Sequence, residues 1–204
     1  MRGTRYASIA ILFCLAFPCG ASGQVHDRFE DWCEGFKNAS LSDLAQFLNA
    51  VVPDESNSRC VTWTIHELGR AHYEPAIPAL AKFLDFRRPL APAEQIFHGL
   101  SLDLYPAETA LELIGRKSLP AVLGVIKADS SSVVAQENAV DVWMVVYRAT
   151  DEQPKGVARL KQEEARASDD ATKQRLRRAI GKALAQCNPP EQAACREAAG
   201  SAAP

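Results

Sequence analysis

Apolar residues recur with the period of an α-helix along most of the chain. From Leu41 to Val52 they stand at positions 41, 44, 45, 48, 51 and 52, which fall on one face of a helix. From Leu176 to Cys187 they stand at 176, 179, 180, 183, 184 and 187 and form a second stripe of the same kind. Alternation typical of strands is scarce. The pattern predicts an all-α protein of about nine or ten helices joined mostly by short loops.

Polar residues beside these stripes predict where helices begin. Ser40 and Asp43 are placed to cap the first stripe, and Thr150 and Gln153 match a capping box for a later helix. Between the stripes, residues 139–148 (AVDVWMVVYR) are apolar on nearly all sides, as expected of a helix with several neighbours.

Short strings recur along the chain. LAQFLN begins at Leu44 and LAKFLD begins thirty-six residues later at Leu80, while VLGVIK from Val122 keeps the apolar spacing. An apolar residue followed by Gly and a basic residue closes IHELGR and LELIGR, at Gly69 and Gly115, and RRAIGK echoes it at 177–182. The predicted unit is a pair of helices. One pair cannot bury its apolar face alone, so neighbouring pairs must stack.

The segment LGRAHYEPAIPALAKFLD, residues 68–85, resembles the HEAT-like repeat of the phycobilisome-lyase type, and LIGRKSLPAVLGVIKAD, residues 113–129, is a second match with a shorter loop. The resemblance implies an α-α superhelix of stacked HEAT-like helical hairpins. We assign it to residues 24–187, and we expect residues 188–204 to form a turn, a short helix and a disordered tail. Bilin lyases carry similar repeats as a scaffold, so the resemblance implies a fold and not an activity.

The first residues have the layout of a secretory signal. Two arginines precede an apolar run of 11 residues at 7–17, and small residues follow, which predicts a signal peptide over residues 1–23 cut before Gln24. The run is shorter than the ~20 residues that a membrane-spanning helix needs. A lipid anchor at Cys19 is the alternative, and Pro18 fits it poorly. We therefore expect export to the bacterial periplasm or the extracellular space, with no membrane span.

Four cysteines follow the predicted signal. An even number in an exported chain indicates two disulfides, and proximity in the sequence favours Cys33–Cys60 and Cys187–Cys195 among the three possible pairings. A zinc site would need closer spacing, such as C-x2-C.

Charge changes this picture little. The chain has 23 basic and 25 acidic residues, and two of the basic ones lie in the predicted signal. This balance argues against general nucleic-acid binding. We expect a monomer.

The sequence predicts no catalytic, cofactor or metal site. HELGR at 66–70 is one letter from a zinc-protease motif, but Arg70 stands where the second histidine ligand is needed. Glu67 and Arg70 are instead expected to form an ion pair on the helix surface. Glu108 and Glu112 lie four residues apart, and we interpret them as a solvated helix face.

The long connection at 85–106 is the candidate site for a partner. Loops of this length are often functional, and aromatic and Arg side chains are favoured at binding hot spots. The candidate partner-binding residues are Phe86, Arg87, Arg88, Phe97, His98 and Tyr105. We expect an exposed Phe86 to anchor an acidic or mixed polypeptide and the two arginines to orient it. The alternative is a partly helical insertion that packs on its own repeat.

These features together predict an exported, non-enzymatic binding or scaffolding module that uses a solenoid surface to bind an unknown protein or peptide. The alternative function is an enzyme or an enzyme-associated maturation factor whose site has no recognisable motif. No cofactor is expected in the first case.

Overall fold

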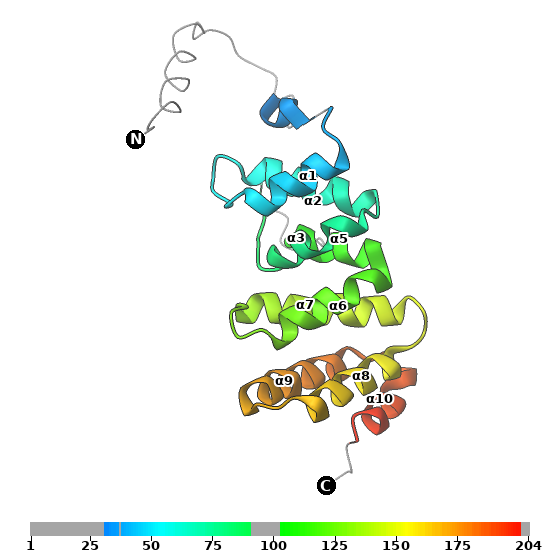
Figure 1. Cartoon of the computed structure of the whole chain (residues 1–204). Helices are drawn as coiled ribbons and strands as arrows, with labels where there is room; N and C mark the ends of the chain where they lie inside the picture. Colours follow the sequence, from blue (N-terminus) through cyan, green and yellow to red (C-terminus); the bar gives the residue numbers. More distant parts are fainter. Residues whose placement is uncertain (1–30, 37, 91–102, 201–204) are drawn as a thin grey trace, which may run out of the picture.

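The computed structural model describes residues 31–36, 38–90 and 103–200 of the chain (Figure 1). Within these ranges all regular secondary structure is helical, which confirms the predicted all-α class. The predicted signal at 1–23 lies outside the described residues, as do Phe97 and His98 of the candidate site.

The helices are distributed along the whole of the described chain. In order, the α-helices are α1 (Leu41–Ala50), α2 (Ser58–Arg70), α3 (Ile77–Lys82), α5 (Pro106–Ile114), α6 (Leu119–Lys127), α7 (Val133–Arg148), α8 (Gln153–Arg166), α9 (Asp170–Gln186) and α10 (Gln192–Ala198). Short 3-10 helices accompany them: η1 (Asp31–Phe36), η2 (Glu74–Ala76), η3 (Gly115–Ser118) and η4 (Pro189–Glu191).

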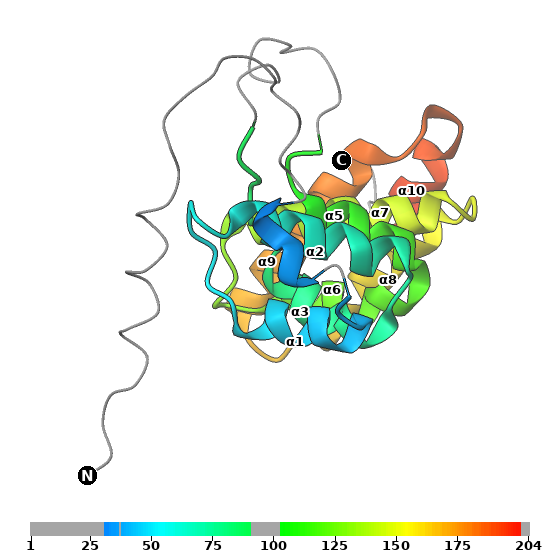
Figure 2. The same cartoon turned by 90° about the horizontal axis from the view of Figure 1, so that it is seen from above.

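The helices follow one another in chain order along the long axis of the molecule (Figure 1). Contacts link α1 to α3 and α3 to α6 on one side, and α2 to α5 and α5 to α7 on the other. The view along the axis places α1, α3 and α6 toward one side and α5 and α7 toward the opposite side (Figure 2). The face formed by α1, α3 and α6 carries the candidate site.

The recurring apolar positions form the core. Leu44 and Leu48 of α1, Leu80 and Leu84 in and just after α3, and Val122 and Ile126 of α6 are all buried, at 2% exposure or less. The strings recur because each copy packs the same face of a helix against its neighbours.

The cap predicted for α1 is confirmed. The Ser40 hydroxyl accepts a hydrogen bond from the Asp43 N–H at 3.2 Å, and the Asp43 carboxylate accepts one from the Ser40 N–H at 3.0 Å. This reciprocal pair satisfies two backbone donors that the helix itself cannot pair.

The capping box predicted before α8 is wrong. Glu152 occupies the N-cap position without a side-chain hydrogen bond, and the Thr150 hydroxyl instead donates to the Tyr147 carbonyl at 3.2 Å. Gln153 is fully buried: its Nε2 donates to the Gln186 carbonyl at 3.2 Å, and its Oε1 accepts from the Asn188 N–H at 3.1 Å. Its amide therefore fixes the turn after α9, a long-range role that the local motif conceals.

The three glycines of the recurring Gly–basic string have three different environments. A Cβ at Gly69 would lie 2.7 Å from both Cα and Cβ of Ala110, so this glycine permits the close approach of α2 and α5. Gly115 ends α5 with φ +75°, a conformation that L side chains rarely adopt. Gly181 lies inside α9 with open space around it, within the apolar stripe predicted from Leu176 to Cys187, so its copy of the string does not mark the end of a helix.

Both predicted disulfides are confirmed. Cys33–Cys60 joins η1 to α2 across a Cα–Cα distance of 5.5 Å, and Cys187–Cys195 joins the end of α9 to α10 across 6.7 Å. Cys195 is fully buried, and α10 packs on α8 and α9. Residues 188–200 therefore fold against the preceding helices, and residues 201–204 lie outside the described part of the chain.

Candidate functional site

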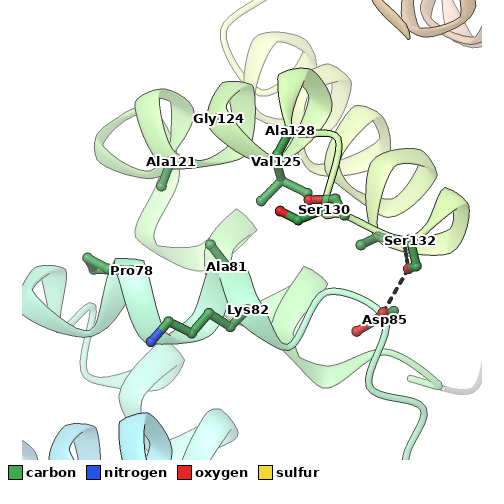
Figure 3. A pocket seen from close by; sticks show the side chains of 12 residues that line it. Pro78, Ala81, Lys82, Asp85, Ala121, Gly124, Val125, Ala128, Ser130 and Ser132 are labelled. Atoms are coloured by element: carbon green, nitrogen blue, oxygen red, sulfur yellow. Dashed lines mark hydrogen bonds between the residues drawn. The ribbon is translucent and has the colours of Figure 1, made fainter. Parts of the chain in front are cut away.

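Three adjoining hollows cross the face formed by α1, α3 and α6. The first has a volume of about 460 Å³ and lies between α3 and α6, at the loop that leads into α7 (Figure 3). Small side chains from both helices line it, so its floor is open to an approaching chain. Its lining includes Lys82 at the end of α3, Asp85 just after that helix, Gly124 of α6 and Ser132 at the N-cap of α7.

The second and third hollows continue from the first toward the loop between α1 and α2. The second, about 330 Å³, shares Lys82 and Asp85 with the first. The third, about 510 Å³, shares Pro53 and Phe86 with the second. Through these shared residues the three hollows adjoin one another across the ends of successive helices, and we call this region the α1–α3–α6 groove.

The groove is lined at the positions where the recurring strings differ. LAQFLN and LAKFLD have Asn49 and Asp85 at their last position, and Gln46 and Lys82 at their third. Three of these four residues line the second hollow, and Gly124, which stands at the third position of VLGVIK, lines the first. The shared apolar letters build the core, and the letters that differ give the groove its chemistry.

Lys82 stands where the first two hollows meet. Its side chain is exposed, and its Nζ donates to Asn49 Oδ1 at 3.3 Å. No carboxylate of the described residues lies within ion-pair distance of it. The nearby Asp85 carboxylate accepts a hydrogen bond from the Ser132 hydroxyl at 2.7 Å, and the two charged side chains are directed away from each other (Figure 3).

Phe86 lies in the groove, but it is less exposed than its spacing from the apolar stripe predicts. The expected exposure assumed that the helix extends past Asp85, whereas α3 ends at Lys82. Phe86 is half-buried, and its ring makes an edge-on contact with Phe83 at a centroid distance of 5.9 Å. It still lines the second and third hollows, where the neighbouring Val52 is 79% exposed.

The other candidate residues divide into different roles. Arg87 is exposed, without a hydrogen bond or ion pair to another described residue. Arg88 instead joins the two ends of the long connection: its N–H donates to the Leu104 carbonyl at 3.0 Å, and its Nε donates to the Asp103 carbonyl. Tyr105 is half-buried at the N-cap position of α5. Arg88 therefore has a structural role, and Arg87 is the exposed cation of the two.

A group of carboxylates lies on another side of the molecule, where α5, α7 and α9 meet. Glu108 and Glu112 are half-buried rather than fully solvated, contrary to the interpretation from the sequence. Burial, followed by the negative charge of Asp141 on α7, raises the pKa of Glu108 to about 7 and raises that of Glu112 in the same direction. Lys182 of α9 partly opposes the rise, and its Nζ lies 2.7 Å from the Asp141 carboxylate.

The HELGR segment forms a surface ion pair as predicted, with Arg70 NH1 3.0 Å from Glu67 Oε1. His66 Nε2 lies 3.5 Å from Asp103 Oδ2, and burial lowers the pKa of His66 despite this acidic neighbour. Across 31–36, 38–90 and 103–200, no group of three or more His, Cys, Asp or Glu side chains is arranged to hold a metal ion.

Comparison of the chain with family models, curated proteins and solved structures finds no match. Among the described helices, none combines the length and the apolar character that crossing a membrane requires. The α1–α3–α6 groove is thus the feature on which a functional argument rests.

Sequence reasoning missed two of the groove's principal residues, Lys82 and Val52. The signal for Lys82 was available in the paired strings, because its position is the one where a neutral Gln46 becomes a cation in the second copy. Val52 gave a misleading signal: it continues the apolar stripe of α1, but the helix ends at Ala50 and leaves it on the surface.

Proposed function

We propose that this protein is an exported, non-enzymatic binding module, a HEAT-like superhelix that holds a polypeptide in the α1–α3–α6 groove. The observation that supports the proposal most directly is that three hollows with shared lining residues adjoin one another across the ends of successive helices. A groove of this form suits a segment of chain better than a compact ligand, because stacked helical hairpins present long, continuous surfaces.

The proposal of export rests on the two disulfides together with the predicted signal. Disulfides form and persist in oxidising compartments, and Cys33–Cys60 and Cys187–Cys195 use all the cysteines that follow residue 23. The HEAT-like assignment rests on the resemblance of residues 68–85 and 113–129 and on the pairwise helix contacts.

Two glycines offer a matched test of the groove. Gly124 is exposed on α6 and lines the first hollow, whereas Gly181 is exposed on α9 and lies outside the three hollows. A Cβ added at either position meets no atom within 4 Å. Gly124→Trp therefore fills the groove, and Gly181→Trp adds the same side chain elsewhere on the surface.

The experiment selects a random peptide library on the immobilised, disulfide-bonded protein and measures the affinity of the enriched peptides by fluorescence anisotropy. We expect the enriched peptides to bind the wild type and Gly181→Trp alike and to bind Gly124→Trp at least about tenfold more weakly, because the indole occupies the space that the peptide needs. Failure of any sequence to be enriched, or equal binding to all three proteins, would overturn the proposal.

A further inference from the structure

A basic surface lies where the end of α6 meets α8 and the first half of α9. The helices α8 and α9 pack side by side toward the C-terminal end of the molecule (Figure 1). Five cations surround two glutamates here, and we call these seven residues the α8–α9 basic patch: Lys127, Arg159, Lys161, Arg166, Arg177, Glu163 and Glu164. None of them lines the three hollows, so this surface is separate from the α1–α3–α6 groove.

Glu163 of α8 holds three of the cations in place. It is 7% exposed, and its Oε2 accepts a hydrogen bond from Lys127 Nζ at 3.0 Å. Its Oε1 lies 3.4 Å from Arg159 NH2 and 3.5 Å from Arg166 NH1. The hydrogen bond from Lys127 lowers the pKa of Glu163, so this carboxylate is ionised at neutral pH. Three cations thus share one negative charge.

Glu164 holds the other two cations. It is buried to the same extent, and its Oε2 accepts from Lys161 Nζ at 2.8 Å, while its Oε1 accepts from Arg177 Nε of α9 at 2.7 Å. These hydrogen bonds lower the pKa of Glu164, so it too is ionised. The two buried glutamates therefore fix the positions of cations on three different helices.

The cations keep hydrogen-bonding capacity for a ligand. Their side chains are between 39% and 68% exposed. A guanidinium has five N–H donors in a planar fork. Among the described residues, Arg166 bonds only through NH1 and Arg177 only through Nε, so each has donors left over. Such a side chain can accept a second carboxylate without releasing its glutamate.

The patch has a surplus of positive charge. Its five cations face two carboxylates, which leaves three positive charges without a negative partner. The bordering residues do not change this surplus, because they contain three cations and three carboxylates: Lys173, Arg175, Arg178, Asp129, Asp169 and Asp170. Arg175 NH1, for example, lies 2.7 Å from Asp129 Oδ1. A surface with this balance attracts a polyanion.

The patch offers this charge without apolar surface. In the described part of the chain the large apolar side chains that are exposed are Val52, Leu113, Val133 and Val134, and none of them belongs to α6, α8 or α9. Polypeptide interfaces are usually centred on buried apolar or aromatic anchors, and helices that lie on membranes insert apolar side chains among the lipids. A sugar chain with anionic groups needs neither of these.

We propose that the α8–α9 basic patch binds an acidic polysaccharide, a sugar chain with a carboxylate on each successive sugar. Its carboxylates pair with Arg159, Arg166 and Arg177, because a guanidinium binds a carboxylate through two parallel hydrogen bonds. Export, as proposed above, brings the patch into contact with polysaccharides outside the cell. The peptide groove has no part in this second activity.

The test titrates a fluorescent galacturonate decamer with the full disulfide-bonded protein and follows anisotropy. We expect binding that weakens at least about threefold between 50 and 200 mM salt, and none to a neutral glucose decamer. Arg166→Gln combined with Arg177→Gln should bind at least about tenfold more weakly, because two of the three surplus charges are lost. Lys127, Arg159 and Lys161 still pair with the buried glutamates, so this variant keeps its fold, which circular dichroism checks.

Arg70→Gln combined with Lys117→Gln is the matched control. These side chains are 66% and 69% exposed, pair with Glu67 and Glu74 elsewhere on the surface, and lower the net charge equally. The control should bind the decamer within about twofold of the wild type. Equal effects of the two double variants would overturn the inference. So would tighter binding of a glutamate decamer, a ten-nucleotide DNA strand or phosphatidylglycerol vesicles. Library peptides should bind all these variants alike, so the groove proposal stands or falls separately.

Discussion

Replacing Glu108 with Gln should stabilise the protein above neutral pH and have progressively less effect in acid. Glu108 is half-buried on α5, facing Asp141 of α7, with Glu112 one turn away and Lys182 as the nearby cation. Its pKa in the folded protein is about 7 against an ordinary value of 4.5. Between these values the folded state holds a proton that the unfolded state has released, so this carboxyl makes stability fall as pH rises.

The size of the effect follows from the same two values. A shift from 4.5 to about 7 sets a ceiling of about 3 kcal/mol on the cost of ionising Glu108 in the folded protein. The side chain keeps some contact with water, whose screening reduces the expected cost to about 1–2 kcal/mol. Glu108→Gln should therefore raise the free energy of unfolding by about 1–2 kcal/mol at pH 8, and the gain should shrink toward zero by pH 4.

Urea unfolding followed by circular dichroism, with the disulfides intact, measures this gain from pH 4 to pH 8. His66 opposes the trend in the wild type, because its lowered pKa makes stability rise with pH, but it is present in both proteins and cancels in the comparison. Glu55→Gln, at an exposed carboxylate, is the control and should leave the curve unchanged. Identical free energies for wild type and Glu108→Gln at pH 8 would refute the half-buried acidic arrangement.

Two further predictions concern the glycines and the second disulfide. Gly69→Ala should lower the free energy of unfolding by about 1–3 kcal/mol, because the new Cβ would lie 2.7 Å from the backbone of Ala110. Gly181→Ala, in open space on α9, should raise it by up to about 1 kcal/mol. Equal melting temperatures for the two variants would contradict the close approach of α2 and α5. Replacing both Cys187 and Cys195 with Ser should lower the free energy of unfolding by about 2–3 kcal/mol, and an unchanged urea midpoint would show that the bridge adds nothing.

The sequence was sufficient for features that depend on near neighbours. The helical class follows from the apolar period, the α1 cap follows from Ser40 and Asp43, and both disulfide pairings follow from proximity along the chain. Each of these features depends on residues that are near one another in the sequence, so their spacing along the chain is enough to predict them.

Features that depend on distant partners could not be predicted in the same way. Gln153 looks like part of a local capping box, but its amide bonds backbone groups more than thirty residues away. The spacing of Glu108 and Glu112, four residues apart on α5, is typical of a solvated helix face. Their partial burial comes from α7 and α9, which the sequence of α5 does not reveal. Phe86 lines the groove, but its exposure could not be predicted because it depends on where α3 ends.

The bonds of Arg88 also have a consequence for engineering the chain. They join Leu104 and Asp103 to the residue after Arg87, so the two ends of the long connection are fixed to each other at the helical body. The entropy of closing a loop rises by only about 0.6 kcal/mol for each doubling of its length. A reporter or an affinity tag inserted into this connection adds only this small entropy of closure, because the bonds between Arg88 and residues 103 and 104 hold its two ends together. This position allows the protein to be labelled or immobilised without altering Val52, Lys82 or Phe86.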